Sequence, residues 1–391
     1  MSPTGANVAE IAAQNVLSRR LRRQIPVHYC ATLFAVAALL PALRLAGLPF
    51  RFTWADDLRA FWITLAGESI FGGTLLYIIA APYADSLGRL FMRYSRQKTR
   101  LLFLVPMIGV LMLVLGIYLG LVLSFATIVI LEVKDRAEEN HISLSKIALD
   151  IFWPAAYFFV GFVVILAYND VIAALRYNGS ADYALKAWDS YLLGGHSISD
   201  FAHAFIRMWP GAVPWLDFIY FAMFAQVGGC IAILALSEGR RKALQFVGTI
   251  MVAFYLALAL FYIWPAAGPF VSCPDHFSRV PEGPMMYSIQ RSLLSSLERF
   301  RLGQSLSIIG QDYYIGLPCM HIVEPIIMLW YLRRWKRLLI ALILFDVLLV
   351  PAIFLLEEHY LVDLLAALPV AVLAILLCGK RTLAQVNGAP K

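Results

Sequence analysis

Two short stretches near the C-terminal end carry the side chains best suited to chemistry. In the later stretch, His359 and Asp363 are four residues apart, a spacing that places both on one face of a helix. A carboxylate in that position can accept a hydrogen bond from one ring nitrogen and fix the tautomer of the other. With His321 of the earlier stretch as a proton donor, such an imidazole can attack phosphorus while the leaving oxygen is protonated.

The apolar runs around these side chains predict that the two imidazoles lie on the same side of a membrane. His321 lies near the start of the run 315–332, and His359 directly precedes the run 360–378. A third run, 338–356, lies between them. If each run crosses the bilayer once, both imidazoles come out on one face, within reach of each other.

The composition excludes an ordinary soluble globular protein. Hydrophobic residues make up 61% of the 391 residues, charged residues only 15%, and the mean hydropathy is +0.74. The net charge of +7 belongs to short loops between apolar runs, which indicates membrane topology and contact with anionic lipids rather than nucleic-acid binding. The five cysteines form no Cys-x-x-Cys pair, so no zinc ribbon is predicted.

These patterns predict an all-α fold, a polytopic membrane helical bundle. We expect an N-terminal membrane region of unknown role at 1–150 with about three apolar segments, a six-helix core at 151–379, and a cytoplasmic tail at 380–391. Within the core, the amphipathic segments 176–214 and 285–302 are expected to lie along the membrane surface rather than across it.

The positive charges predict the orientation of the core, because Lys and Arg favour the cytoplasmic side. The basic loops at Arg240, Arg333 and Lys380 come out together, and His321 and His359 come out on the opposite side. We therefore expect a multi-pass protein of the plasma or inner membrane whose active face is external or periplasmic.

The two stretches resemble motifs of the type-2 phosphatidic acid phosphatase superfamily. Pro318-Cys319-Met320-His321 is similar to that family's Pro-Ser-x-His motif except at Cys319. His359-Tyr360-Leu361-Val362-Asp363 matches the His-Tyr-x-x-Asp form of the inositol phosphorylceramide synthase branch, and 265–269 is similar to that branch's Pro-x-x-Gly-Pro segment. The resemblance covers roughly residues 151–378 and implies that the six-helix core is of the phosphatase type.

The resemblance also implies a mechanism. His359, held by Asp363, would attack phosphorus and form a phosphohistidine, while His321 protonates the departing oxygen. A second acceptor would then take the phosphoryl group: water makes the enzyme a phosphatase, and a lipid or sugar hydroxyl makes it a phosphotransferase. Neither a metal ion nor another cofactor is expected.

Substrate contacts are expected from motif positions and from the outer segment between apolar runs, because the family's motif of Lys followed by Arg-Pro is absent. A cysteine is a weaker donor than the serine it replaces, but backbone amides at a helix start can bind an anion, and arginine can clamp phosphate bidentately. The residues expected to contact the substrate, or in the last case to orient His321, are Cys319, Met320, Gly268, Tyr360, Arg279, Arg291 and Glu324.

The sequence favours an integral membrane phosphotransferase that acts on a phospholipid or phosphorylated lipid, because Gly268 and Tyr360 match the inositol phosphorylceramide synthase branch. Two alternatives stay open: a lipid phosphate phosphatase and, from another class, a non-catalytic lipid-binding or transport protein, which Cys319 and acids within apolar runs would fit. The expected partner is a membrane lipid. A disulfide between Cys273 and Cys319, both on the predicted active face, also stays open.

Overall fold

The computed structural model describes residues 28–29, 31–35, 37–38, 50–51, 144–273, 275–302, 306–307 and 316–386. Most of the predicted N-terminal membrane region at 1–150 lies outside these residues, as does the end of the predicted tail. The three predicted N-terminal apolar segments are therefore not described, apart from short stretches of the first.

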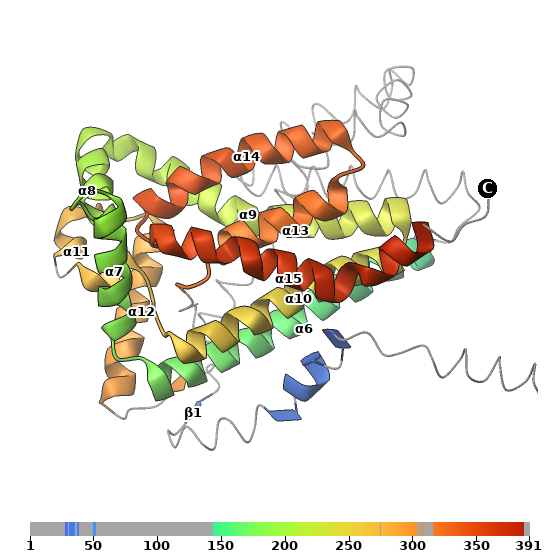
Figure 1. Ribbon diagram of the computed structural model, residues 1–391, viewed down its shortest axis with the longest axis horizontal. Coiled ribbons are helices and arrows are strands. Elements are labelled where there is room, and N and C mark those ends of the chain that lie inside the picture. The colour runs from blue at the N-terminus through green and yellow to red at the C-terminus, as the bar shows by residue number, and fades with distance from the viewer. Residues whose placement is uncertain are drawn as a thin grey trace, which may run out of the picture.

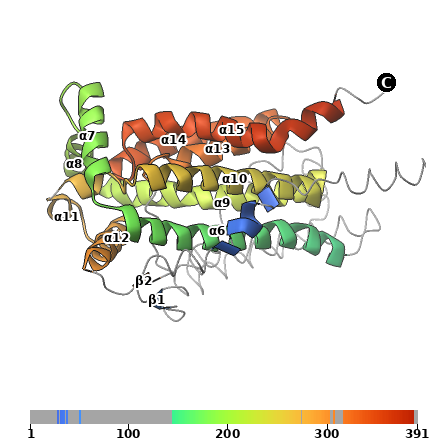
Figure 2. The ribbon, with the colours of Figure 1, turned by 60° about the horizontal axis from the view of Figure 1, so that its bottom comes forward.

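Six helices run side by side and form the body of the molecule (Figure 1, Figure 2). Five of them contain a stretch long and apolar enough to cross a membrane, and the sixth, α13, is a shorter apolar helix. The described residues thus confirm the predicted all-α polytopic bundle. The six helices are α6 Leu144–Arg176, α9 Val213–Glu238, α10 Arg240–Ile263, α13 Met320–Leu332, α14 Lys336–Leu355 and α15 Leu361–Val386.

Helix α10 lies at the centre of the bundle, packed against α6, α9, α13 and α15. Its large side chains Phe246, Ile250 and Phe261 are fully buried. Helices α14 and α15 instead leave apolar side chains such as Leu344 and Leu365 exposed, each at 64–65%. A helix that is apolar all round must be buried in protein or face lipid, so the exposed sides of α14 and α15 suit contact with lipid.

Shorter helices cover one end of the bundle, at the left of Figure 1, and α7 runs crosswise to the long helices. Helix α8 begins at a capping box, in which the side chains of Ser197 and Asp200 each accept from the other's backbone amide. The segments predicted as surface helices are thus helical. The short elements are α7 Ser180–Leu192, α8 Ile198–Met208, η1 Pro210–Ala212, η2 Pro269–Ser272, α11 His276–Arg279 and α12 Met285–Arg301.

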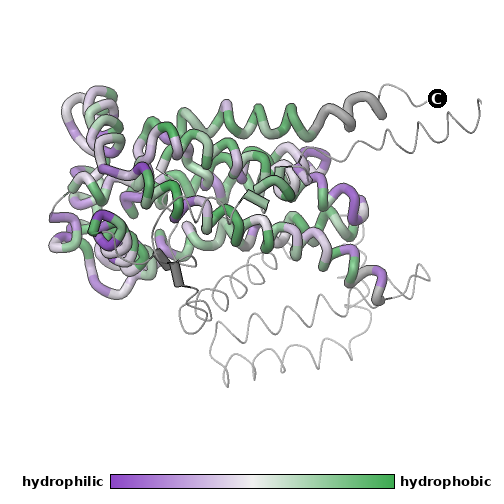
Figure 3. The backbone as a smooth tube through the Cα atoms, turned by 90° about the horizontal axis from the view of Figure 1, so that it is seen from below, coloured by the Kyte–Doolittle hydropathy of each residue, from purple (hydrophilic) through white to green (hydrophobic). Residues whose placement is uncertain are grey.

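The basic loops gather at the other end of the bundle. Arg334 in the α13–α14 loop lies 3.5 Å from Glu238 at the end of α9, and Gln245 of α10 donates to the carbonyl oxygen of Cys378 in α15. Figure 3 shows hydrophilic residues at the two ends and hydrophobic residues between them. This arrangement matches the grouping of basic loops from which the orientation was predicted.

The described residues contain two very short strands, β1 Phe50–Arg51 and β2 Leu306–Ser307, which pair in parallel. Each strand has two residues, so the pair joins the N-terminal part of the chain to the segment after α12 without adding a sheet layer.

Candidate active site

A cavity lies where α6, α9, α10, α12 and α13 meet the loop before α15. Most of its lining side chains are apolar or aromatic, including Phe162, Phe224 and Phe254. No lysine or arginine is among the described residues that line it. The polar lining residues are Tyr220, His321, Glu324, Glu358 and His359.

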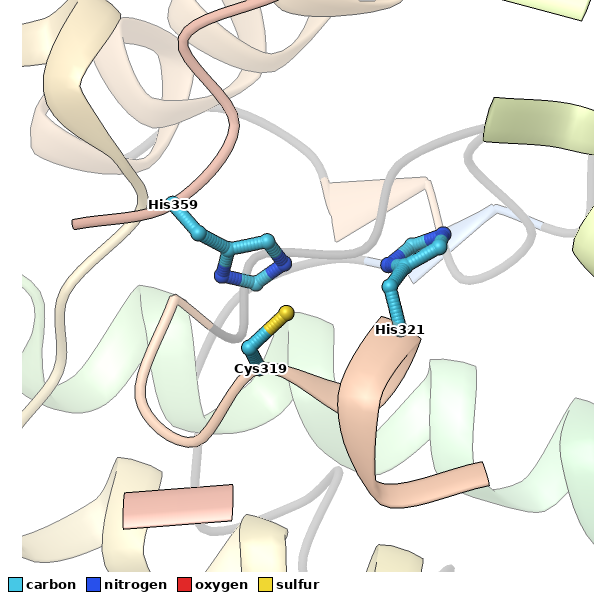
Figure 4. A group of neighbouring side chains, drawn as sticks. All are labelled: Cys319, His321 and His359. Carbon is cyan, nitrogen blue, oxygen red and sulfur yellow. The ribbon is translucent and has the colours of Figure 1, made fainter. Parts of the chain in front are cut away.

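The side chains of His321 and His359 meet on the wall of this cavity. Their ring centroids are 5.8 Å apart, and a nitrogen of each ring and the sulfur of Cys319 all lie within 4.8 Å of one another. Figure 4 shows the His359 ring extending toward the His321 ring, with the Cys319 sulfur beside the His359 ring on the side of His321. The two imidazoles that the order of apolar runs predicted on one face are therefore neighbours. Cys273 and Cys319 are both free thiols.

A backbone carbonyl is the closest partner of His359. Its Nδ1 lies 2.8 Å from the carbonyl oxygen of Gly316, to which it can only donate, so in the neutral ring Nε2 carries the lone pair. Asp363 Oδ2 is farther from the same nitrogen, at 3.5 Å. Helix α15 begins only at Leu361, so the prediction that a helical face joins His359 to Asp363 was wrong. The contact arises because the loop folds back over the helix start.

Asp363 links the two stretches that the sequence singled out. Its Oδ2 accepts a hydrogen bond of 2.7 Å from the backbone amide of Tyr360, which fixes the start of α15. Its backbone carbonyl accepts from the amide of Cys319 at 3.1 Å. Asp363 is fully buried, so both the His359 loop and the loop before α13 are held against a rigid residue.

The surroundings of His359 favour its protonated form. Burial lowers the pKa of this imidazole, but the neighbouring Cys319 and Asp363 outweigh that effect and hold the pKa above its ordinary value. A protonated ring would attract an anion, and it would have to lose a proton before Nε2 could act as a nucleophile.

His321 has both ring nitrogens available. Its ring packs on Tyr220, with centroids 3.9 Å apart, and neither nitrogen has a hydrogen-bond partner among the described residues. The two carboxyl oxygens of Glu324 are equally unpartnered there, so no hydrogen bond to Glu324 orients His321 in the described part of the chain. Buried polar atoms without partners on a cavity wall are typical of groups that a ligand satisfies.

Gly268 and Tyr360, predicted to contact substrate, lie behind the His359 loop. The Tyr360 hydroxyl donates to the carbonyl oxygen of Gly268 at 3.1 Å and contacts Ser272 Oγ at 3.2 Å. Gly268 has φ 143°, and a Cβ on it would lie 2.8 Å from the carbonyl oxygen of Glu358. Only glycine fits this close approach. The contacts made by both residues support the loop that carries His359.

Two buried acids of α7 anchor this support, and the sequence analysis missed them. Asp182 Oδ1 accepts from the amides of Ala267 and Gly268, each at 2.9 Å. Asp189 accepts from the amide of Leu361, the first residue of α15, at 2.8 Å. Burial raises the pKa of Asp182 to about 7. The sequence does carry a signal for these two acids: both lie on the apolar face of an amphipathic helix, where a buried carboxyl group needs a hydrogen-bond partner.

The arginines predicted to bind phosphate have other contacts. Arg279 pairs with Asp275, and the guanidinium of Arg291 lies 5.0 Å from the centre of the Phe277 ring. Neither lines the cavity, so their contact with substrate stays a prediction. Cys319 is fully buried beside the two rings, and Met320 lines the cavity wall.

Glu358 is a cavity residue that no sequence motif indicated. Its Oε1 accepts a hydrogen bond of 2.5 Å from Gln290, and Tyr220 donates to its Oε2 at 3.4 Å. Burial raises the pKa of this carboxyl to about 7. It lies directly before His359 in the chain, so its protonation state changes the charge of the cavity wall beside the His359 ring.

These features define a class: a polytopic helical membrane protein with two buried imidazoles on the wall of one largely apolar cavity. In a comparison with family models, the model of the PAP2 superfamily matches residues 185–377, about half of the chain. The match supports assignment to the type-2 phosphatidic acid phosphatase superfamily, whose members are in general phosphatases and phosphotransferases. Neither the search of curated proteins nor that of solved structures gives a match.

Proposed function

We propose that the protein is an integral membrane phosphotransferase that moves a phosphate-containing group between lipids through a phosphohistidine, similar to inositol phosphorylceramide synthase. The observation that carries this proposal is the pair of imidazoles, with ring centroids 5.8 Å apart, on the wall of a cavity with aromatic and aliphatic lining. The imidazoles supply groups that can act on a phosphate, and the apolar lining suits a hydrocarbon chain.

In this proposal His359 is the nucleophile and His321 is the acid. Once an anionic phosphate group lies beside both rings, its charge stabilises a protonated His321. His359 then gives its Nε2 proton to that ring, whose nitrogens have no partner among the described residues. Nε2 then forms a bond to phosphorus, the bond from phosphorus to the leaving oxygen breaks, and His321 returns the proton to that oxygen. In the second half, His321 takes the proton of an acceptor hydroxyl, whose oxygen displaces His359 from phosphorus.

The cavity lining supports transfer to a lipid hydroxyl over hydrolysis. Side chains such as Phe162, Phe254 and Leu293 surround the site, and an apolar wall excludes water while it accommodates acyl chains. A lipid acceptor whose hydroxyl is delivered with its chain therefore reaches the phosphohistidine at a higher local concentration than water does.

The charges around the cavity support a phosphodiester as the donor. The carboxyl groups of Glu324 and Glu358 line the cavity together with the His359 ring, whose protonated form is favoured, and no lysine or arginine lines it within the described ranges. A phosphomonoester carries up to two negative charges at neutral pH, whereas a phosphodiester carries one and is repelled less. We therefore propose a phospholipid donor.

The arrangement of basic loops supports an active face outside the cytoplasm. The loops that contain Arg240 and Arg334 lie at the end of the bundle opposite the short helices. Positive loops favour the cytoplasm, so the proposed active face is external or periplasmic.

A transfer assay with the purified full chain in nanodiscs tests the proposal. A radiolabelled phospholipid donor is supplied with and without a lipid hydroxyl acceptor, and products are separated by thin-layer chromatography. We expect a new phosphodiester lipid that forms only with acceptor, together with an acid-labile radiolabel on the protein that His359→Ala abolishes. An exposed histidine, His196, gives the control substitution His196→Ala.

The other results have defined meanings. Release of water-soluble phosphate whether or not acceptor is present would support a lipid phosphate phosphatase. Equal behaviour of His359→Ala and the unsubstituted protein, with no labelled protein and no product, would support a non-catalytic lipid-binding protein.

A further inference from the structure

A second cluster of buried histidines lies beside the proposed active site. His203 of α8, His276 of α11 and Glu357 of the loop before α15 each offer one ligand atom, and these atoms lie within 4.8 Å of one another. His276 Nδ1 is 2.6 Å from Glu357 Oε2, and His203 Nε2 approaches the same oxygen at 2.9 Å. All three side chains are almost fully buried, at 3%, 1% and 0% exposure.

A glutamine holds a proton on one ring nitrogen of His276, and the other nitrogen faces the cluster. The side-chain amide nitrogen of Gln290 donates to the carbonyl oxygen of Leu356 at 2.7 Å and to Glu358. Its oxygen must then accept, from His276 Nε2 at 2.8 Å. With a proton on Nε2, His276 Nδ1 can either carry a second proton and donate to Glu357 or, in the neutral ring, offer its lone pair to a metal ion beside Glu357. A hydrogen bond of this kind on the far nitrogen is typical of metal-bound histidine.

The cluster also leaves buried atoms unsatisfied. His203 Nε2 lies 2.9 Å from Glu357 Oε2 but without the geometry of a hydrogen bond, and Glu357 Oε1 makes none with the described residues, although both side chains are buried. Glu357 has φ 59°, and it is the single residue other than glycine with a positive φ in the described ranges. A left-handed backbone is unfavourable for glutamate, and such strain persists where the surrounding structure fixes it. Here it turns the carboxylate toward the two histidines.

We propose that His203, His276 and Glu357 bind a zinc ion. Two imidazole nitrogens and one carboxylate oxygen are a donor set that zinc takes in proteins, and a fourth position would be filled by water. Ligand atoms about 2.0 Å from a tetrahedral ion lie about 3.3 Å apart, so the observed separations must widen by less than about 1 Å. This site is separate from the proposed reaction, in which no step uses a metal ion.

The zinc ion would hold three segments together at the end of the bundle. Its ligands come from α8, α11 and the loop that continues through Glu358 to His359. Because Glu357 is two residues before His359, a metal at Glu357 fixes the loop that presents the proposed nucleophile. The three ligands are thus positioning residues.

Cobalt substitution tests the site in the unsubstituted full chain. The purified protein in detergent is depleted of metal with a chelator and titrated with Co²⁺, and its absorption spectrum is recorded. We expect visible bands of a tetrahedral nitrogen and oxygen site, without the near-ultraviolet thiolate-to-cobalt band. Cys319, His321 and His359 form the other set with metal-ligand spacing in the described residues, and binding there would show the thiolate band and overturn the proposal.

Zinc content gives a second test. We expect roughly one zinc ion per chain after gel filtration, which falls at least about tenfold in His203→Ala and in Glu357→Gln. Neither His196→Ala, at an exposed histidine before α8, nor His321→Ala should change it. Zinc should also raise the unfolding temperature of the metal-depleted protein.

Three further results would overturn the proposal. They are a metal-free protein whose unfolding temperature zinc leaves unchanged, full zinc content in His203→Ala, or loss of zinc in His321→Ala. The first would mean that the cluster is a buried ion pair between Glu357 and protonated histidine. None of these measurements depends on phosphotransfer activity. Failure of the zinc proposal would therefore leave the proposed function intact, and failure of the proposed function would leave the zinc proposal intact.

Discussion

The Nδ1 atom of His359 lies 2.8 Å from the carbonyl oxygen of Gly316 and 3.5 Å from Asp363 Oδ2. The carbonyl keeps the proton on Nδ1, and the carboxylate adds charge beside the ring. The orientation of the proposed nucleophile therefore depends on the loop before α13 as well as on its own motif.

Asp363→Asn should reduce the rate without abolishing it. The asparagine oxygen can still accept from the amide of Tyr360, and the Gly316 carbonyl still holds Nδ1, so the loss is that of the negative charge. We expect kcat for lipid transfer to fall on the order of 10- to 100-fold, whereas His359→Ala should leave no measurable transfer. Asp275→Asn, at an exposed acid, is the control. A loss in Asp363→Asn as complete as in His359→Ala would contradict this division of roles.

Gly268→Ala should destabilise the loop that carries His359. Its Cβ would lie 2.8 Å from the carbonyl oxygen of Glu358, and its φ of 143° is unfavourable for alanine. We expect a loss of about 1–3 kcal/mol in the free energy of unfolding, with reduced kcat. Gly283→Ala is a matched control, because Gly283 also has a positive φ, 114°, but a Cβ there meets nothing within 4 Å. Equal effects of the two substitutions would show that the contact with Glu358 is unimportant.

Tyr360→Phe separates a supporting role from a substrate contact. The hydroxyl is bound to Gly268 and Ser272 behind the loop, so its removal should cost about 1 kcal/mol in unfolding free energy and leave KM for the donor lipid unchanged. Thermal unfolding and steady-state kinetics measure the two effects. Tyr183→Phe, on the exposed side of α7, is the control. A raised KM with unchanged stability would restore the predicted substrate contact.

Binding of an anionic donor should weaken as the pH rises through about 7. The pKa of Glu358 is raised to about 7 by burial, so this carboxyl is neutral below that pH and negative above it. We expect KM to rise on the order of tenfold between pH 6 and 8, and Glu358→Gln should remove much of that rise. An equally steep profile in the variant would exclude Glu358 as the titrating group.

The same group predicts a stability effect of defined sign. The ordinary pKa of glutamate is 4.5 and the folded value is about 7, so the folded protein binds the proton more tightly. The stabilising contribution of protonated Glu358 is full below about pH 4.5 and is lost as the pH rises through about 7. Glu358→Gln should flatten this part of the curve of unfolding temperature against pH.

The long apolar runs predicted the bundle well, because a membrane-spanning helix leaves a continuous signal in the sequence. The predicted run 315–332 and helix α13 both end at Leu332. The helix begins later than the run, at Met320. Asp182 and Glu358 could not be assigned from spacing alone, since their partners are far away in the chain. The contact between Asp182 and Gly268 spans 86 positions.

The order of crossings explains why the imidazole pair was predictable when the rest of the site was not. When three successive helices each cross the membrane once, the start of the first and the start of the third lie on the same membrane face. His321 and His359 lie near those two starts, so both had to be on one face. No such rule applies to Arg279 and Arg291, because they lie on short helices whose rotation depends on packing. The cluster of His203, His276 and Glu357 escaped notice for the same reason.

Three consecutive residues before α15 face three different surroundings. Glu357 faces two histidines, Glu358 faces the cavity through Gln290 and Tyr220, and His359 faces His321. Each of these three side chains reaches its own surroundings only if the number of residues between this turn and the start of α15 stays the same. Insertion or deletion of a single residue would move each side chain into its neighbour's place, so this turn should tolerate many changes of residue more readily than any change of length.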